Sequence, residues 1–174
     1  DNGSFLVSNY TLSFTTGVTF EIKEKGIGAL TITVAKGPFT YDGTAKTPSV
    51  TVADRSTTLK EETDYTVMYS NNINAGTAKV TITGKGDYTG SVTKEFTIEK
   101  RNLTVTPSAN QSKVYGEADP STLTYGYTGN VSGETPKFSG SLVRQAGENV
   151  GTYAITQGTL ALINNGTFLT NNYN

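Results

Sequence analysis

The sequence contains no cysteine, no histidine and no tryptophan, and it has a single methionine among 174 residues. Without cysteine the chain forms no disulfide bond, so its fold must depend on core packing. Without histidine and cysteine it lacks the usual general base, the usual thiol nucleophile and the commonest metal ligand. These absences argue against an enzyme. We therefore predict no catalytic residue, no cofactor and no metal site.

Charged residues are also few, and long hydrophobic runs are missing. The chain has 14 basic and 15 acidic residues, a net charge of −1, and no basic stripe of the kind that binds nucleic acid. No apolar run approaches the roughly 20 residues that a membrane helix needs. We expect neither nucleic acid as a partner nor insertion into a membrane.

What the chain does have is threonine, valine, isoleucine, tyrosine and phenylalanine in alternation, broken by glycine, asparagine and aspartate. The first group favours pleated strands and the second favours turns, so the pattern predicts an all-β fold. Ala78, Val80 and Ile82 should face a core, and Met68 should lie opposite Val67 and Tyr69. The predicted strands of the first half are 30–34, 39–41, 50–52, 65–69, 78–82 and 88–98, with a hairpin-type turn at Asp42-Gly43.

The same order of signals then starts again. Leu30-Thr-Ile-Thr-Val34 corresponds to Leu103-Thr-Val-Thr106, and Asn74-Ala-Gly-Thr-Ala78 corresponds to Asn149-Val-Gly-Thr-Tyr153. We therefore predict two divergent copies of one module, residues 26–100 and 101–174, preceded by residues 1–25.

The two ends of the chain resemble each other. Residues 1–11 align without gaps with residues 164–174, which is typical of one period of a longer repeat. In the first module residues 87–100 form the closing strand, and their counterpart lies at the front of the chain, at residues 9–25. We interpret residues 1–25 as an orphan closing strand or hairpin that belongs to a preceding repeat. Its alternating apolar residues are Tyr10, Leu12, Phe14, Val18, Phe20 and Ile22.

Both modules resemble known families. Residues 27–100 resemble the YDG-type repeats of bacterial surface proteins through Phe39-Thr-Tyr-Asp-Gly-Thr-Ala45 and Gly84-Lys-Gly-Asp-Tyr-Thr-Gly90. Residues 101–174 resemble MBG repeats (YGX type) through Val114-Tyr-Gly-Glu-Ala-Asp-Pro120 and Gly147-Glu-Asn-Val-Gly-Thr-Tyr153. The resemblance implies small immunoglobulin-like β-sandwich modules, arranged in tandem in secreted or surface-attached adhesin-like proteins. It also implies that the second module lacks its last strand, because an MBG repeat should continue past Asn172-Tyr173.

A module without its last strand exposes a sheet edge and an apolar groove. Residues 9–22 are poorly placed to close the second module of their own chain. The seven residues between Ile22 and Leu30 span at most ~25 Å, whereas a module is about 30 Å long. We therefore predict head-to-tail joining, in which residues 9–22 complete the second module of a neighbouring repeat. The neighbour is either a separate copy of the chain or an adjacent repeat of one polypeptide.

These observations predict a structural repeat unit of an extracellular fibre or cell-surface stalk. The alternative is a ligand- or carbohydrate-binding adhesin module that uses exposed tyrosines, with Tyr41, Tyr69, Tyr115, Tyr125 and Tyr127 as candidates. Two acidic groups, Glu61-Glu62 with Asp64 and Glu117 with Asp119, are more simply explained as solvated loop acids than as a glycosidase pair or a calcium site. If the chain is glycosylated, the sequons give as candidate sites Asn2, Asn9, Asn102, Asn110, Asn130 and Asn165.

Overall fold

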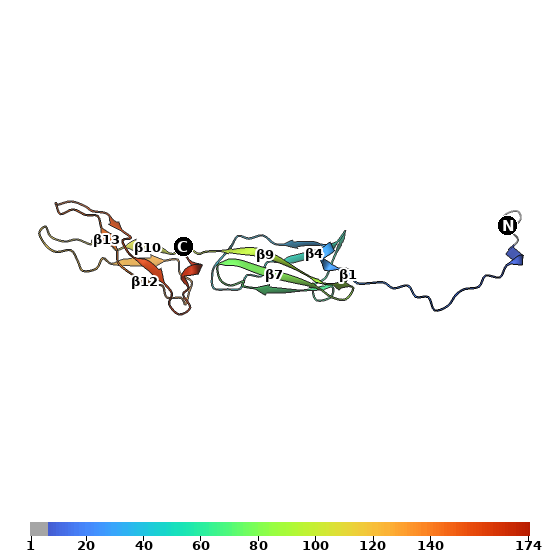
Figure 1. Cartoon of the computed structure of the whole chain (residues 1–174). Coiled ribbons are helices and arrows are strands. Elements are labelled where there is room, and N and C mark those ends of the chain that lie inside the picture. Colours follow the sequence, from blue (N-terminus) through green and yellow to red (C-terminus); the bar gives the residue numbers. More distant parts are fainter. Residues whose placement is uncertain (1–6) are drawn as a thin grey trace.

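The computed structural model describes residues 7–174, and strands dominate it. Its only helical elements within that range are three single 3-10 turns, η1 (Val7–Asn9), η2 (Ile27–Ala29) and η3 (Thr170–Asn172). The all-β prediction is confirmed. In Figure 1 an extended N-terminal segment, residues 10–24, leads into two β regions that follow one another along an elongated molecule. We call residues 25–100 the first region and residues 101–174 the second region.

The first region has a four-stranded sheet in the order β3-β9-β7-β6, a three-stranded sheet in the order β2-β4-β5, and the short pair β1-β8. Its strands are β1 (Lys25–Gly26), β2 (Thr31–Val34), β3 (Phe39–Thr40), β4 (Val50–Asp54), β5 (Thr57–Thr58), β6 (Tyr65–Ser70), β7 (Gly76–Gly84), β8 (Tyr88–Thr89) and β9 (Ser91–Glu99).

A core lies between these two sheets. Val52 comes from β4, Val80 and Ile82 come from β7, and all three side chains are completely buried. Period-two alternation places them there, because successive side chains of a strand point to opposite faces. The inward orientation predicted for Ala78, Val80 and Ile82 is confirmed, and Met68 lies on the exposed side of β6.

β9 holds the four-stranded sheet together. It pairs antiparallel with β7 and parallel with β3, so that Ile98 stands between Gly76 and Phe39 in the register. Ile98 is buried, while Val92 and Phe96 of the same strand are partly buried against the core. Removing this strand would expose the facing edges of β3 and β7.

The second region is less completely paired. Its strands are β10 (Thr104–Pro107), β11 (Tyr125–Thr128), β12 (Lys137–Ser139), β13 (Val143–Arg144), β14 (Ile155–Thr156) and β15 (Ala161–Ile163). They form three separate antiparallel pairs, β10-β11, β12-β15 and β13-β14. The pairs β10-β11 and β13-β14 correspond in order and direction to β2-β4 and β6-β7 of the first region.

A second apolar cluster joins the two regions. The buried side chains of Tyr41 and Ile98 from the first region meet Phe168 and Tyr173 from the second. The rings of Phe168 and Tyr173 stack with centroids 4.8 Å apart, and Tyr41 meets Tyr173 edge-on at 5.6 Å. We call these side chains, together with Glu134 and Asn172, the junction.

Polar groups inside the junction are satisfied. The hydroxyls of Tyr41 and Tyr173 donate to the two carboxylate oxygens of Glu134. Burial, followed by the hydrogen bond to Glu134, raises the pKa of Tyr41 to about 12. The side chain of Asn172 is buried, and its Oδ1 accepts a hydrogen bond from the backbone N–H of Ala75 at 2.9 Å. A partnered buried amide of this kind fixes one arrangement of the two regions.

The structure bears on two local predictions. Residues 11–24, most of the predicted orphan strand or hairpin of residues 9–25, form no ladder with any described strand, so the pairing of this segment stays a prediction. The turn at Asp42-Gly43 does not connect a hairpin, since β3 pairs with β9 rather than with the strand that follows it. Asp42 instead accepts hydrogen bonds from the backbone and hydroxyl of Thr44, which is an Asx turn.

Candidate functional site

The N-terminal segment presents a row of exposed apolar side chains. The exposed fractions of Leu12, Phe14, Val18, Phe20 and Ile22 lie between 83% and 92%, and that of Tyr10 is 65%. Figure 1 shows the segment extending away from both β regions. Exposed apolar side chains gathered on one segment are typical of interaction surfaces.

The second region has a gap where the first region has β9. By the sequence correspondence, residues 113–115 take the place of β3 and residues 151–157 take the place of β7. Within residues 7–174, no strand lies between these two segments and no backbone hydrogen bond joins them. A groove of about 400 Å3 lies there, lined on one side by residues 111–113 and Tyr115 and on the other by residues 147–153 and Ile155. We call it the upper groove.

Apolar side chains project beside the upper groove. Tyr115 on one wall and Val150 on the other are well exposed, as is Val114 next to Tyr115 in the sequence. Such side chains gain about 25 cal/mol for each Å2 of apolar surface removed from water. The lining of the groove thus combines apolar side chains with charged and polar ones, among them Lys113, Arg144 and Glu148.

A second groove continues from the first. It has a volume of about 700 Å3 and is lined by apolar side chains of β10, β12 and the stretch from β14 to β15, including Val105, Phe138 and Leu160, and by Leu142, which precedes β13. We call it the lower groove. Ile155 of β14 lines both grooves, so together they follow one strand edge.

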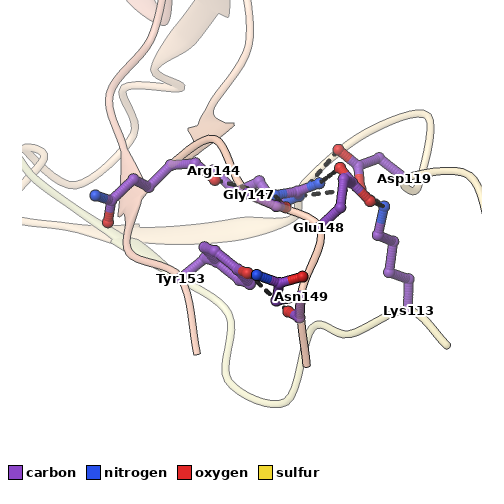
Figure 2. Close-up of polar contacts among 8 residues, drawn as sticks. Lys113, Asp119, Arg144, Gly147, Glu148, Asn149 and Tyr153 are labelled. Atoms are coloured by element: carbon purple, nitrogen blue, oxygen red, sulfur yellow. Dashed lines mark hydrogen bonds and ion pairs between the residues drawn. The ribbon is translucent and has the colours of Figure 1, made fainter. Parts of the chain in front are cut away.

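Four charged side chains tie the walls of the upper groove together (Figure 2). Lys113 Nζ lies 3.0 Å from Asp119 Oδ1 and 2.6 Å from Glu148 Oε2. Arg144 donates from Nε to Asp119 at 3.0 Å and from Nη2 to Glu148 at 2.6 Å. The guanidinium carbon also lies 5.3 Å from the ring centroid of Tyr153. We call Lys113, Asp119, Arg144 and Glu148 the ion-pair cluster.

The ion-pair cluster is fully charged at neutral pH. Hydrogen bonds from Lys113, and then from Arg144, hold the pKa values of Asp119 and Glu148 below their usual range. The same contacts raise the pKa values of Lys113 and Arg144. Because these groups are exposed, water and salt screen their attraction. Their clearest effect is geometric, since they fix the distance between residue 113 and the loop at 144–149.

Of the other candidate residues named from the sequence, Asp119 and Tyr115 line the upper groove, whereas the acidic group at residues 61–64 and Tyr41 lie elsewhere. Within the described range, acidic side chains form no group of three that could hold a metal ion. Asp119 is engaged with Lys113 and Arg144, and Asp64 accepts a hydrogen bond from the backbone N–H of Lys60. Tyr41 is buried in the junction, so it offers no free aromatic face.

The remaining aromatic candidates are similarly dispersed. The rings of Tyr125 and Tyr127 contact Phe138, and the hydroxyl of Tyr69 donates to the backbone carbonyl of Pro48. Tyr115 is the candidate that stands most clearly in solvent, beside the upper groove. The tyrosines named from the sequence do not form a single row.

Among the candidate glycosylation sites, Asn2 lies outside the described residues. Asn9, Asn102, Asn110 and Asn165 are exposed, and Asn130 is half-buried. The side-chain amide of Asn130 donates to the backbone carbonyl of Glu134, and that of Asn165 donates to the carbonyl of Thr135. Asn9 and Asn110 are therefore the more accessible candidates.

Neither the ion-pair cluster nor the junction could be recognised from the sequence. Arg144 and Glu148 stand four residues apart, but Lys113 and Asp119 join them only through tertiary structure. The one usable signal was the position of Lys113 and Asp119 on either side of Tyr115-Gly116. Dispersed charges next to a motif are too common to identify a cluster without coordinates.

Comparison with known proteins supports part of the family resemblance. Residues 103–174 match the MBG domain (YGX type). No curated protein and no solved structure matches the chain. The match confirms the resemblance of the second region, whereas the resemblance of residues 27–100 to YDG-type repeats stays a prediction. The MBG match is compatible with a module of a surface or secreted repeat protein. None of the described helices has the length and apolar character required to cross a membrane.

Proposed function

We propose that the chain is a structural repeat unit of an extracellular fibre or surface stalk. Neighbouring units join head to tail, with residues 9–22 of one unit completing the second region of the next. The contact is heterologous, so successive units add without closing into a symmetric dimer. The unit acts mechanically, and its acidic side chains serve solubility and turn formation rather than catalysis.

The observation that carries this proposal is the complementarity within one molecule. An extended segment exposes five large apolar side chains to solvent. At the other end, the upper groove, with exposed apolar side chains beside its ion-pair cluster, and the apolar lower groove share Ile155 of β14. An added strand would satisfy both, because its backbone pairs with the edge and its alternate side chains fill the grooves.

The finer fold in this proposal is two immunoglobulin-like sandwiches in tandem. In the first region, β2-β4-β5 and β3-β9-β7-β6 enclose one core in the manner of a two-sheet sandwich. The pairs β10-β11 and β13-β14 repeat part of that plan. A strand placed beside β14 would give the second region the same layout.

Sugar binding by an adhesin module has weaker support. Tyr41 is buried and the rings of Tyr125 and Tyr127 contact Phe138, which leaves Tyr115 as an isolated aromatic side chain in solvent. Stacking platforms for sugars need a continuous exposed aromatic surface. Binding of purified chain to a glycan array would support the adhesin alternative.

Electron microscopy of purified protein tests the proposed function. The full chain should form fibres or short linear oligomers, and a variant without residues 1–22 should remain monomeric. Hydrogen exchange should then show poor protection across residues 101–174 in the truncated variant, because their strand edge is uncovered. A variant without residues 1–8 is the matched control and should assemble. Assembly of the variant without residues 1–22 at full-length levels would refute the proposal.

A further inference from the structure

In the first region, β9 shows how a strand could lie in the grooves of the second region. The N-terminal segment aligns with β8 and β9 without a gap. In that alignment Tyr10 corresponds to Tyr88, Phe14 to Val92, Val18 to Phe96, Phe20 to Ile98 and Glu21 to Glu99. Ile98, the counterpart of Phe20, is buried in the junction, whereas Phe20 itself is exposed.

The second region supplies counterparts for both neighbours of β9. Gly151, Tyr153 and Ile155 correspond to Gly76, Ala78 and Val80 of β7. Lys113 corresponds to Phe39 of β3. In the first region β9 pairs Ile98 with Gly76 on one side and with Phe39 on the other.

The residue directly before the place of β9 makes the same kind of pairing in both regions. In the first region Tyr88 pairs parallel with Lys25, directly before β9. In the second region Tyr173 forms a parallel bridge with Arg101. Residues 164–174 resemble residues 1–11, so Tyr173 also corresponds to Tyr10. Among the described residues, none takes the positions that follow in β9, which begin with the counterpart of Leu12.

We propose that residues 12–21 of a second copy of this chain occupy the two grooves in the register of β9. This inference rests on the proposed function. The strand runs antiparallel to residues 151–157 and parallel to residues 113–114. Phe20 then lies opposite Gly151, Val18 opposite Tyr153 and Phe14 opposite Gln157.

The spacing of the large side chains agrees with the spacing of the grooves. Gly151 and Lys113 line the upper groove, so this register places Phe20 there. Gln157 lines the lower groove, so Phe14 is placed there. Thr16, a smaller residue on the same face, comes opposite Ile155, which separates the grooves. A slip of one residue would turn all of these side chains to the solvent face.

Cysteine pairing tests the register directly, because the chain has no cysteine of its own. The variant Thr19→Cys is mixed with a size-tagged Thr152→Cys variant under mild oxidation. The proposed register places these two positions opposite each other, with Cα atoms about 4.5–5.5 Å apart, within disulfide reach. The matched control is Thr156→Cys, an exposed threonine on the same strand face, four residues and roughly 13 Å away.

We expect a mixed disulfide dimer from Thr19→Cys with Thr152→Cys and at least tenfold less from Thr19→Cys with Thr156→Cys. Preferential or equal linking at position 156 would overturn the register and leave strand donation standing. The same holds if neither pair links although assembly still requires residues 1–22. If neither pair links and sedimentation shows only monomers, the proposed function fails as well. An intramolecular link in the double variant Thr19→Cys, Thr152→Cys would show closure within one chain and overturn the second copy as occupant.

Discussion

Replacing Phe20 by alanine should weaken assembly and leave the free energy of unfolding of the monomer unchanged. Phe20 is 92% exposed in the single chain, so its ring stabilises nothing there. Its counterpart Ile98 is 1% exposed and belongs to the first region's own sheet. Ile98→Ala should therefore do the opposite and destabilise the monomer.

The size of both effects follows from burial. If Phe20 becomes as buried in a neighbour as Ile98 is in its own sheet, truncation should cost about 2–4 kcal/mol per contact. That corresponds to a dissociation constant roughly 30- to 1,000-fold higher. The change in monomer stability for Phe20→Ala should stay within about 0.5 kcal/mol, as for other surface substitutions. Ile98→Ala should lower it by about 2–5 kcal/mol.

Sedimentation equilibrium measures the first quantity, and urea unfolding at concentrations where the chain is monomeric measures the second. The dilution matters because association itself stabilises the folded state. Thr19→Ala, which changes a side chain on the solvent face of the proposed strand, is the control and should alter neither value appreciably. Unchanged assembly of Phe20→Ala would refute the reasoning, as would a loss of monomer stability equal to that of Ile98→Ala.

Two further predictions concern the junction. Because the pKa of Tyr41 is raised from 10.0 to about 12, its contribution to stability should be complete below pH 10 and should be lost as the pH rises through about 12. The difference in absorbance at 295 nm between the chain and Tyr41→Phe follows this ionisation, and titration near pH 10 would contradict the burial of the hydroxyl. Asn172→Ala should lower the free energy of unfolding in urea by about 1–3 kcal/mol, because the backbone N–H of Ala75 loses its acceptor. An unchanged midpoint would show that water replaces the amide.

Five predicted strands of the first region agree with β2, β3, β4, β6 and β7 to within two residues, the predicted strand 88–98 is divided into β8 and β9, and the two-residue strands β1 and β5 were not predicted. β2, β6 and β7 each bury alternate apolar side chains, and period two is a local signal. Most strands of the second region could not be predicted, because β13 and β14 are two residues long and carry no measurable period. The Asx turn at Asp42 shows the same limit, since the dipeptide specified a turn but not the strand that follows it.

In the candidate site, too, features formed by consecutive residues could be predicted, and features formed by tertiary contacts could not. The apolar face of the N-terminal segment is a property of consecutive residues, so Phe14, Val18 and Phe20 could be named in advance, and their role as a donated strand stays a prediction. The grooves combine residues near 113, 138 and 155 that only folding brings together. The sequence makes Tyr41 a candidate ligand-binding residue because tyrosine rings can offer aromatic faces to a sugar. It is instead part of the junction, where Glu134 and Tyr173 enclose it through contacts of long sequence separation.

The parallel pairing at the start of the first region determines how that region would carry tension. β1 and β8 run in the same direction, with Lys25 beside Tyr88 and the backbone N–H of Lys25 bonded to Asp87. Pulling the chain before Lys25 and the chain after β9 in opposite directions therefore slides these strands past each other. Their hydrogen bonds are loaded in shear and must yield together, rather than opening one by one as at a hairpin end. The resistance of the first region to forced unfolding would then depend on the rate at which the hydrogen bonds between β1 and β8 break together.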